Sequence, residues 1–211
     1  MTIIDKRLVG ATRLNLGSGT DPFPGWVNID MCSFPGVDLV HDLTEALPLE
    51  DESVDAIFTA HTLEHISYRL ASFAVADWMR VLRIGGRIQI MVPNLEYLVE
   101  QYVTSNVHYL QLVQQLYGGL SDACFDTHKN AIDFAWLQGQ LGWFGCDVVL
   151  RLSHVDPTVL SVIATKSRHV DGIEKPTIAL IKPKTVEELN ERRANVKHDL
   201  NTAMGSSKET D

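Results

Sequence analysis

The sequence lacks the features that define membrane proteins and secreted disulfide scaffolds. No apolar run of 18 or more residues occurs in its 211 residues, so no transmembrane helix is predicted. The start, MTIIDKRLVG, carries an acid and no long apolar region, so no secretory signal is predicted. The three cysteines, Cys32, Cys124 and Cys146, are too widely spaced to predict a disulfide framework or a paired-cysteine metal site. We therefore expect reduced thiols in a cytoplasmic protein.

Basic residues are also scarce. The chain has 18 Lys and Arg against 27 Asp and Glu, which gives a formal net charge of −9. The imbalance is strongest in the first 60 residues, where ten acids face three bases. A chain of this kind offers no basic face to a phosphate backbone, so non-specific nucleic-acid binding is disfavoured.

The rest of the composition is typical of a globular protein, with 45% hydrophobic and 21% charged residues. Short apolar strands alternate with segments of helical periodicity, which predicts an α/β fold with a mostly parallel sheet. Gly85-Gly86 is expected to cap the first of these helices at its carboxyl end. Strands are predicted at 13–16, 26–30, 37–40, 54–60 and 87–92, with an antiparallel edge hairpin at 146–152 and 159–165, and helices at 63–82, 95–117, 129–143 and 185–200.

A glycine loop and an acid mark the candidate binding site. Gly17-Ser18-Gly19 follows the first strand, and the next strand ends at Asp30. Glycines let a ligand approach the backbone closely, and an acid in this place accepts hydrogen bonds from ribose hydroxyls. The pattern predicts a nucleoside-binding crevice at the carboxyl ends of parallel strands. An NAD-dependent dehydrogenase is the weaker alternative, because the third glycine of that fingerprint falls at Pro22.

Four segments carry a family resemblance: LNLGSG, NID, HDLTEALPLEDESVDAIFTAHTLEHI and ADWMRVLRIGGRIQIMVPN. In this order they resemble the class I S-adenosylmethionine-dependent methyltransferases, and within them the methyltransferase type 11-like proteins associated with polysaccharide biosynthesis. The resemblance implies a single-domain Rossmann-like fold with a seven-stranded, mostly parallel sheet whose last strand is antiparallel. It places the methyltransferase domain at 1–183, a helical lid at about 95–127 after the fifth strand, and a helix with a polar tail at 184–211.

The resemblance also implies a cofactor site for S-adenosyl-L-methionine. Asp30 would hold the ribose hydroxyls, and Asp42 with Leu43 would meet the adenine. The full implied set is Leu16, Gly17, Ser18, Gly19, Asp30, Met31, Asp42, Leu43 and His61. One departure is the connection between the first two strands: only nine residues separate Leu16 from Trp26. The helix usual in this place is therefore expected to be absent or one turn long.

Histidines supply the catalytic candidates. His61 follows the fourth strand and His128 precedes the helix at 129–143, and an imidazole suits proton transfer near neutral pH. For His128, a capping or core role is the plainer alternative. On a helix, His61, Glu64 and His65 would share one face and could ligate a metal, as an E-x-x-E-H motif does in some relatives. Because His61 replaces the first acid, we predict no metal, with Glu64 and His65 as the weaker candidates.

The expected function is methyl transfer to a small polar acceptor, above all a hydroxyl of a sugar or glycan precursor. Two alternatives stay open: an N-methyltransferase acting on a small-molecule amine, and an inactive methyltransferase-fold subunit that binds a partner. No NPPY-type motif follows the fourth strand, which argues against methylation of a base amine in nucleic acid. Acceptor specificity is expected to reside in the lid at about 95–127, whereas the identity of the acceptor cannot be read from the sequence. A homodimer is left open.

Overall fold

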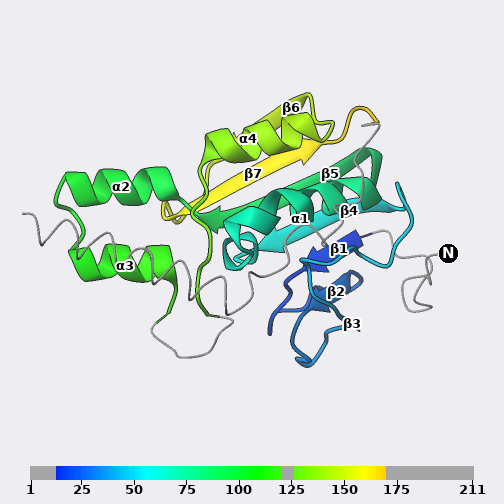
Figure 1. Ribbon diagram of the computed structural model, residues 1–211, viewed down its shortest axis with the longest axis horizontal. Helices are drawn as coiled ribbons and strands as arrows, with labels where there is room; N and C mark the ends of the chain where they lie inside the picture. The colour runs from blue at the N-terminus through cyan, green and yellow to red at the C-terminus, as the bar shows by residue number, and fades with distance from the viewer. Residues whose placement is uncertain (1–12, 120–125, 170–211) are drawn as a thin grey trace, which may run out of the picture. The chain divides into compact units, whose positions relative to one another are not determined.

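The computed structural model describes residues 13–119 and 126–169. Within them, seven strands form one sheet in the order β3-β2-β1-β4-β5-β7-β6 (Figure 1). Strands β1 to β5 pair in parallel, whereas β7 is antiparallel to both β5 and β6. This confirms the predicted sheet. The strands are β1 Arg13–Leu16, β2 Val27–Asp30, β3 Leu39–Val40, β4 Val54–Ala60, β5 Leu82–Pro93, β6 Val148–Leu152 and β7 Val159–Thr165.

The core lies between the sheet and two helices, α1 Tyr68–Val81 and α4 Phe134–Trp143. The sheet contributes buried side chains such as Leu14, Ile57 and Ile88. Helices α1 and α4 contact each other, and both contact strands of the sheet (Figure 1). Burying these apolar faces supplies the main favourable free energy of folding.

The first helix differs from its prediction at both ends. Residues Leu63–His65 form a short 3-10 turn, and α1 begins only after Ser67, whose hydroxyl accepts from the backbone N–H of Arg69. At the other end, α1 stops at Val81 and the chain enters β5 directly. The glycine cap predicted at Gly85-Gly86 is therefore wrong. These glycines lie inside β5, next to an irregularity in its pairing with β4.

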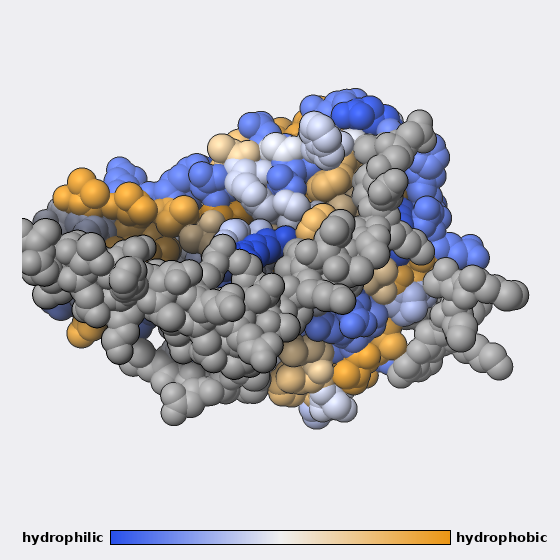
Figure 2. Space-filling model, viewed as in Figure 1, coloured by the Kyte–Doolittle hydropathy of each residue, from blue (hydrophilic) through white to orange (hydrophobic). Residues whose placement is uncertain are grey.

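The predicted helix at 95–117 is two helices, α2 Leu95–Val103 and α3 Tyr109–Tyr117. The break includes Ser105, whose positive φ of 61° is incompatible with a right-handed helix. Together they form the predicted helical insertion after β5, and hydrophobic residues cover much of the visible surface of α2 (Figure 2). Val103 there is 74% exposed.

Helix α4 begins at Phe134 rather than at 129. The side chain of Asp133 accepts from the backbone N–H of Trp136 at 2.7 Å and caps the helix there. The preceding residues 129–133 are therefore part of the connection from α3, and they are free to contribute to the site described below.

No helix occurs in the ten residues that connect β1 to β2, as predicted. The buried side chain of Asn28 organises this connection instead. Its Oδ1 accepts from the backbone N–H of Phe23 at 2.7 Å and from Asn15 Nδ2 at 2.9 Å. Its Nδ2 donates to the carbonyls of Phe23 and Trp26, each at 3.2 Å. Side-chain hydrogen bonds from β2 therefore replace a crossover helix.

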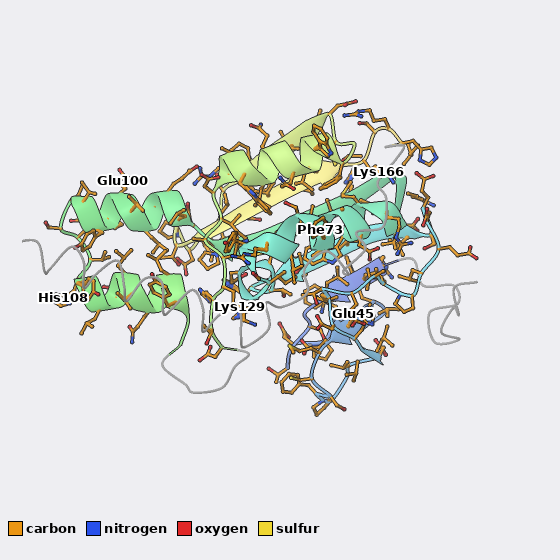
Figure 3. The ribbon with its side chains drawn as sticks, in the orientation of Figure 1. Glu45, Phe73, Glu100, His108, Lys129 and Lys166 are labelled. Carbon is orange, nitrogen blue, oxygen red and sulfur yellow. The ribbon has the colours of Figure 1, made fainter. Side chains whose placement is uncertain are left out.

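Lys166, which directly follows β7, hydrogen-bonds to the carboxyl-terminal end of α1 (Figure 3). Its side chain is 5% exposed, and Nζ donates to the carbonyls of Met79 at 2.9 Å and Leu82 at 2.8 Å. Glu52 lies 3.2 Å from the same nitrogen. The carbonyls at the end of a helix lack partners within that helix, so Lys166 satisfies groups that would otherwise be buried unbonded.

Replacing Lys166 with methionine should lower the free energy of unfolding by about 3 kcal/mol, because two carbonyls and a carboxylate lose their buried partner. Urea denaturation followed by circular dichroism measures the change. The matched control is Lys129→Met at an exposed lysine, which should stay within about 0.5 kcal/mol of the parent. Equal stability of the two variants would contradict this role for Lys166.

Some predictions fall outside the described residues: the domain boundary at 183/184, the helix at 185–200 and Cys124. Among the helices that the structure describes, none has both the length and the hydropathy needed to cross a membrane.

Candidate functional site

A cavity of about 310 Å³ opens beside the carboxyl ends of β1, β2, β3 and β4. Its position matches the edge of an open α/β sheet where ligands bind, and its volume is in the range of small-molecule sites. Leu16 and Ser18 are buried and do not line it. The other predicted cofactor residues all line this cavity: Gly17, Gly19, Asp30, Met31, Asp42, Leu43 and His61.

Gly17 occupies a position that tolerates no side chain. Its φ is +69°, and a Cβ built on it would lie 2.0 Å from Thr62 Oγ1. Thr62 is held in turn by donating to the carbonyl of Ala60 at 3.1 Å and of Leu16 at 3.3 Å. The loop after β1 and the turn after β4 therefore meet at this point, and both Gly17 and Thr62 line the cavity. Thr62 was not predicted as a site residue, because only the tertiary fold brings it next to Gly17.

The Asp30 carboxylate is fixed at the end of β2. Its Oδ2 accepts from the backbone N–H of Gly19 at 2.8 Å, and Oδ1 accepts from the N–H of Cys32 at 2.8 Å. A carboxylate oxygen can accept more than one hydrogen bond. Asp30 therefore orders the glycine loop and still has acceptor capacity on the cavity side.

Asp42 follows β3 on the same wall of the cavity. Its Oδ1 accepts from the backbone N–H of Thr44 at 2.9 Å and from the hydroxyl of Thr44 at 2.8 Å. This local turn sets the direction of the chain at Leu43 and Thr44, which also line the cavity.

His61 and Glu64 form a pair at the rim of the cavity. His61 Nδ1 lies 3.1 Å from Glu64 Oε1, and the side chains are 53% and 1% exposed. The hydrogen bond with Glu64 raises the pKa of His61. Because Nδ1 faces Glu64, Nε2 is the nitrogen left for a ligand. The predicted shared helix face is wrong, since His61 has a φ of +51° and precedes the 3-10 turn.

His128 does not line this cavity. It borders a separate space of about 10 Å³, which Glu64 also lines. Its Nδ1 lies 3.1 Å from the carbonyl of Gln115, and burial lowers its pKa. The ring of His128 contacts the ring of His65 edge to face, with centroids 4.9 Å apart. The two predicted catalytic histidines therefore border different spaces: His61 lines the large cavity, and His128 lines the small space that it shares with Glu64.

The comparisons with known proteins agree with this architecture. Residues 15–90 match the family Methyltransf_11, described as a methyltransferase domain. A search of curated proteins found no match.

Among solved structures, a SAM-dependent methyltransferase from Archaeoglobus fulgidus is 17% identical with a TM-score of 0.52, over 74% of this chain and 87% of that one. One from Methanosarcina mazei is 15% identical with a TM-score of 0.52, over 74% of this chain and 92% of that one. A SAM-dependent methyltransferase from Thermotoga maritima, described as a possible histamine N-methyltransferase, is 15% identical with a TM-score of 0.52, over 74% and 82% of the two chains. At these identities the likeness shows the fold.

The family match and the fold together indicate a methyltransferase that uses S-adenosylmethionine. The cavity fits this cofactor. It offers a backbone cradle at Gly17 and a fixed carboxylate at Asp30, as a ribose requires. Two carboxylates, Asp30 and Asp42, line it against one lysine, Lys129, and this acidic balance suits a positively charged sulfonium better than a phosphate.

Cysteine labelling can test occupancy of the cavity. Cys32 lines it, whereas Cys146 is buried and burial raises its pKa to about 11. At pH 8 a maleimide should therefore modify Cys32 and spare Cys146, because the thiolate is the reactive form. S-adenosylhomocysteine at ten times its Kd should slow labelling of Cys32 about tenfold. Peptide mass spectrometry resolves the two sites, and unchanged labelling of Cys32 would place the cofactor elsewhere.

Proposed function

We propose that the protein transfers a methyl group from S-adenosylmethionine to a hydroxyl of a small polar acceptor, a sugar or glycan precursor. The observation that carries the proposal is the His61–Glu64 pair beside the cofactor cavity. A hydroxyl oxygen must lose its proton when it is methylated, whereas a neutral amine already carries a nucleophilic lone pair. A positioned base at the cavity rim therefore favours oxygen as the acceptor atom.

The cofactor would be held by residues from three strand ends. The glycine loop at Gly17 and Gly19 would lie against its amino-acid portion, and Asp30 would accept from both ribose hydroxyls. Asp42 and Leu43 would bind the adenine. None of these groups is cationic, which agrees with a cofactor that has no phosphate.

The chemistry needed from the protein is positioning and proton transfer. The cofactor supplies an activated methyl group, whose bonding electrons return to sulfur as the new C–O bond forms. His61 Nε2 would accept the hydroxyl proton, and Glu64 Oε1 would hold Nδ1–H and balance the charge of the imidazolium. The proton would then leave to solvent, since His61 is half exposed. This arrangement of a histidine oriented by a buried carboxylate is a recurrent one for general bases.

We assign recognition of the methyl acceptor to the residues that connect α3 to α4. Lys129 of this connection lines the cavity, and its backbone N–H donates to the carbonyl of Glu64 at 2.7 Å (Figure 3). The connection therefore sits against the catalytic pair. The sugar class itself rests on the sequence resemblance to proteins associated with polysaccharide biosynthesis.

Two measurements test the proposal. Calorimetry should detect binding of S-adenosylmethionine and S-adenosylhomocysteine, and absence of binding would favour an inactive subunit. A methyl-transfer screen should then compare nucleotide sugars with small-molecule amines at equal concentration. Transfer to a sugar hydroxyl is expected, and transfer to the amines alone would overturn the choice of oxygen.

A further inference from the structure

Three side chains beside the cofactor cavity form a cluster with metal-binding chemistry. Glu64 and His65 belong to the 3-10 turn after β4, and His128 comes from the connection before α4. One potential ligand atom from each lies within 4.8 Å of the other two. His128 lies 63 positions after His65, so only the fold brings it to the other two residues.

The histidine hydrogen bonds select the ring nitrogens that can bind a metal. His65 Nδ1 lies 3.2 Å from the carbonyl of Thr127, and His128 Nδ1 lies 3.1 Å from the carbonyl of Gln115. A carbonyl oxygen can only accept, so Nδ1 carries the proton in both rings. Each neutral ring then presents the lone pair of Nε2, and such a backbone contact is the usual support of a metal-bound histidine.

The carboxylate of Glu64 gives independent evidence for a bound cation, because one of its oxygens has an unused hydrogen-bonding capacity. Its side chain is 1% exposed, and Oε1 is used by His61. The other oxygen, Oε2, is buried and has no hydrogen-bond partner among the described residues. A buried carboxylate oxygen without a partner is costly. A cation bound at Oε2 removes this cost without disturbing the His61 contact.

We propose that Glu64, His65 and His128 bind a divalent transition-metal ion of the zinc class. Two imidazoles and one carboxylate form a common ligand set for such ions and leave a fourth position open. Ligands held at about 2.1 Å from one tetrahedral ion lie about 3.4 Å apart. Atoms 4.8 Å apart therefore have to close by about 1.4 Å, which rotation of the side chains can supply. Glu64 and His128 also line a space of about 10 Å³, which is near the minimum that admits one water, whereas His65 lines the larger cavity.

The ion would join the turn after β4 to the connection between α3 and α4. The backbone already links these segments, since the N–H groups of Lys129 and Asn130 donate to the carbonyl of Glu64 at 2.7 and 3.1 Å. Metal binding would add a side-chain link at the same place. This role does not depend on methyl transfer, because the ligands are Glu64 Oε2 and two Nε2 atoms that the proposed proton transfer does not use.

The test is direct metal binding by the full chain without cofactor. Calorimetry with Zn²⁺ and visible absorption with Co²⁺ should show one site per chain, and metal at 100 times its Kd should raise the melting temperature by about 5–10 °C. Metal affinity should fall by at least about 100-fold in each of the variants Glu64→Gln, His65→Gln and His128→Gln. Loss of a residue that only supports a metal ligand already costs up to about 100-fold in affinity. The control is His169→Gln, since His169 is exposed and pairs with Glu52 instead.

Absence of stoichiometric binding would overturn the site, and so would equal affinity in the three variants and the control. Each glutamine preserves bulk, and three separate variants keep the test decisive if one of them does not fold. Titration of S-adenosylhomocysteine into the same samples reports the cofactor site separately. Loss of metal binding with intact cofactor binding, or the reverse, therefore shows which proposal has failed.

Discussion

Asp30→Ala should weaken binding of S-adenosylhomocysteine by at least about 100-fold. Two hydrogen bonds from ribose hydroxyls to a charged acceptor contribute roughly 3 kcal/mol together, and about 1.4 kcal/mol corresponds to a factor of ten. The alanine also removes the acceptor for the N–H groups of Gly19 and Cys32, so the glycine loop loses its support. Isothermal titration calorimetry of the two proteins gives the affinity ratio.

Two further variants separate charge from structure. Asp30→Asn retains one acceptor oxygen but turns an amide donor toward a backbone N–H, so its affinity should lie between those of the parent and the alanine variant. Asp147→Asn is the control, because Asp147 is exposed and its partner is Arg168. If all four proteins bind the cofactor equally, Asp30 is not the ribose acid.

His61→Ala should lower kcat by about 1,000-fold, within the range contributed by a general base. Cofactor affinity should change far less, because His61 acts on the acceptor proton and Asp30 still holds the ribose. Initial rates at saturating cofactor and acceptor, together with calorimetry, separate the two effects. Added imidazole should restore part of the rate by occupying the vacated space.

The matched control for this variant is His169→Ala, an exposed histidine that does not line the cavity. Its kcat should equal that of the parent. A His61→Ala enzyme with full activity would remove His61 as the base and would favour an acceptor that needs none, such as an amine.

The strands and the cavity were predictable from sequence for a physical reason. A buried strand requires a short apolar run, and the glycine loop and Asp30 come directly after such runs. Parallel strands place their carboxyl ends at one edge of the sheet. Residues at those ends therefore lie close together, however many residues separate them in the sequence. The seven predicted cofactor residues that line the cavity all occupy such positions or the turns that follow them.

Helix boundaries and the histidine cluster were less predictable. Apolar spacing continues through Leu63 to Ile66, but this segment is a 3-10 turn and not part of α1. Residues 104–108 hold a single apolar side chain, and the chain leaves the helical conformation there. Caps at Ser67 and at His108 decide where the helices begin. His128 approaches Glu64 through tertiary packing alone, and no local spacing encodes that meeting.

The short connection between β1 and β2 also has a kinetic consequence. Leu14 pairs with Val27, so this parallel ladder joins residues only 13 positions apart. Parallel strands usually need a longer crossover, and the entropy lost on closing a loop grows with its length. Pro22 and Pro24 reduce that loss further by restricting the unfolded chain. The β1–β2 pair is thus a local contact, and it can form early in folding, before the distant β5–β7 pairing closes the other half of the sheet.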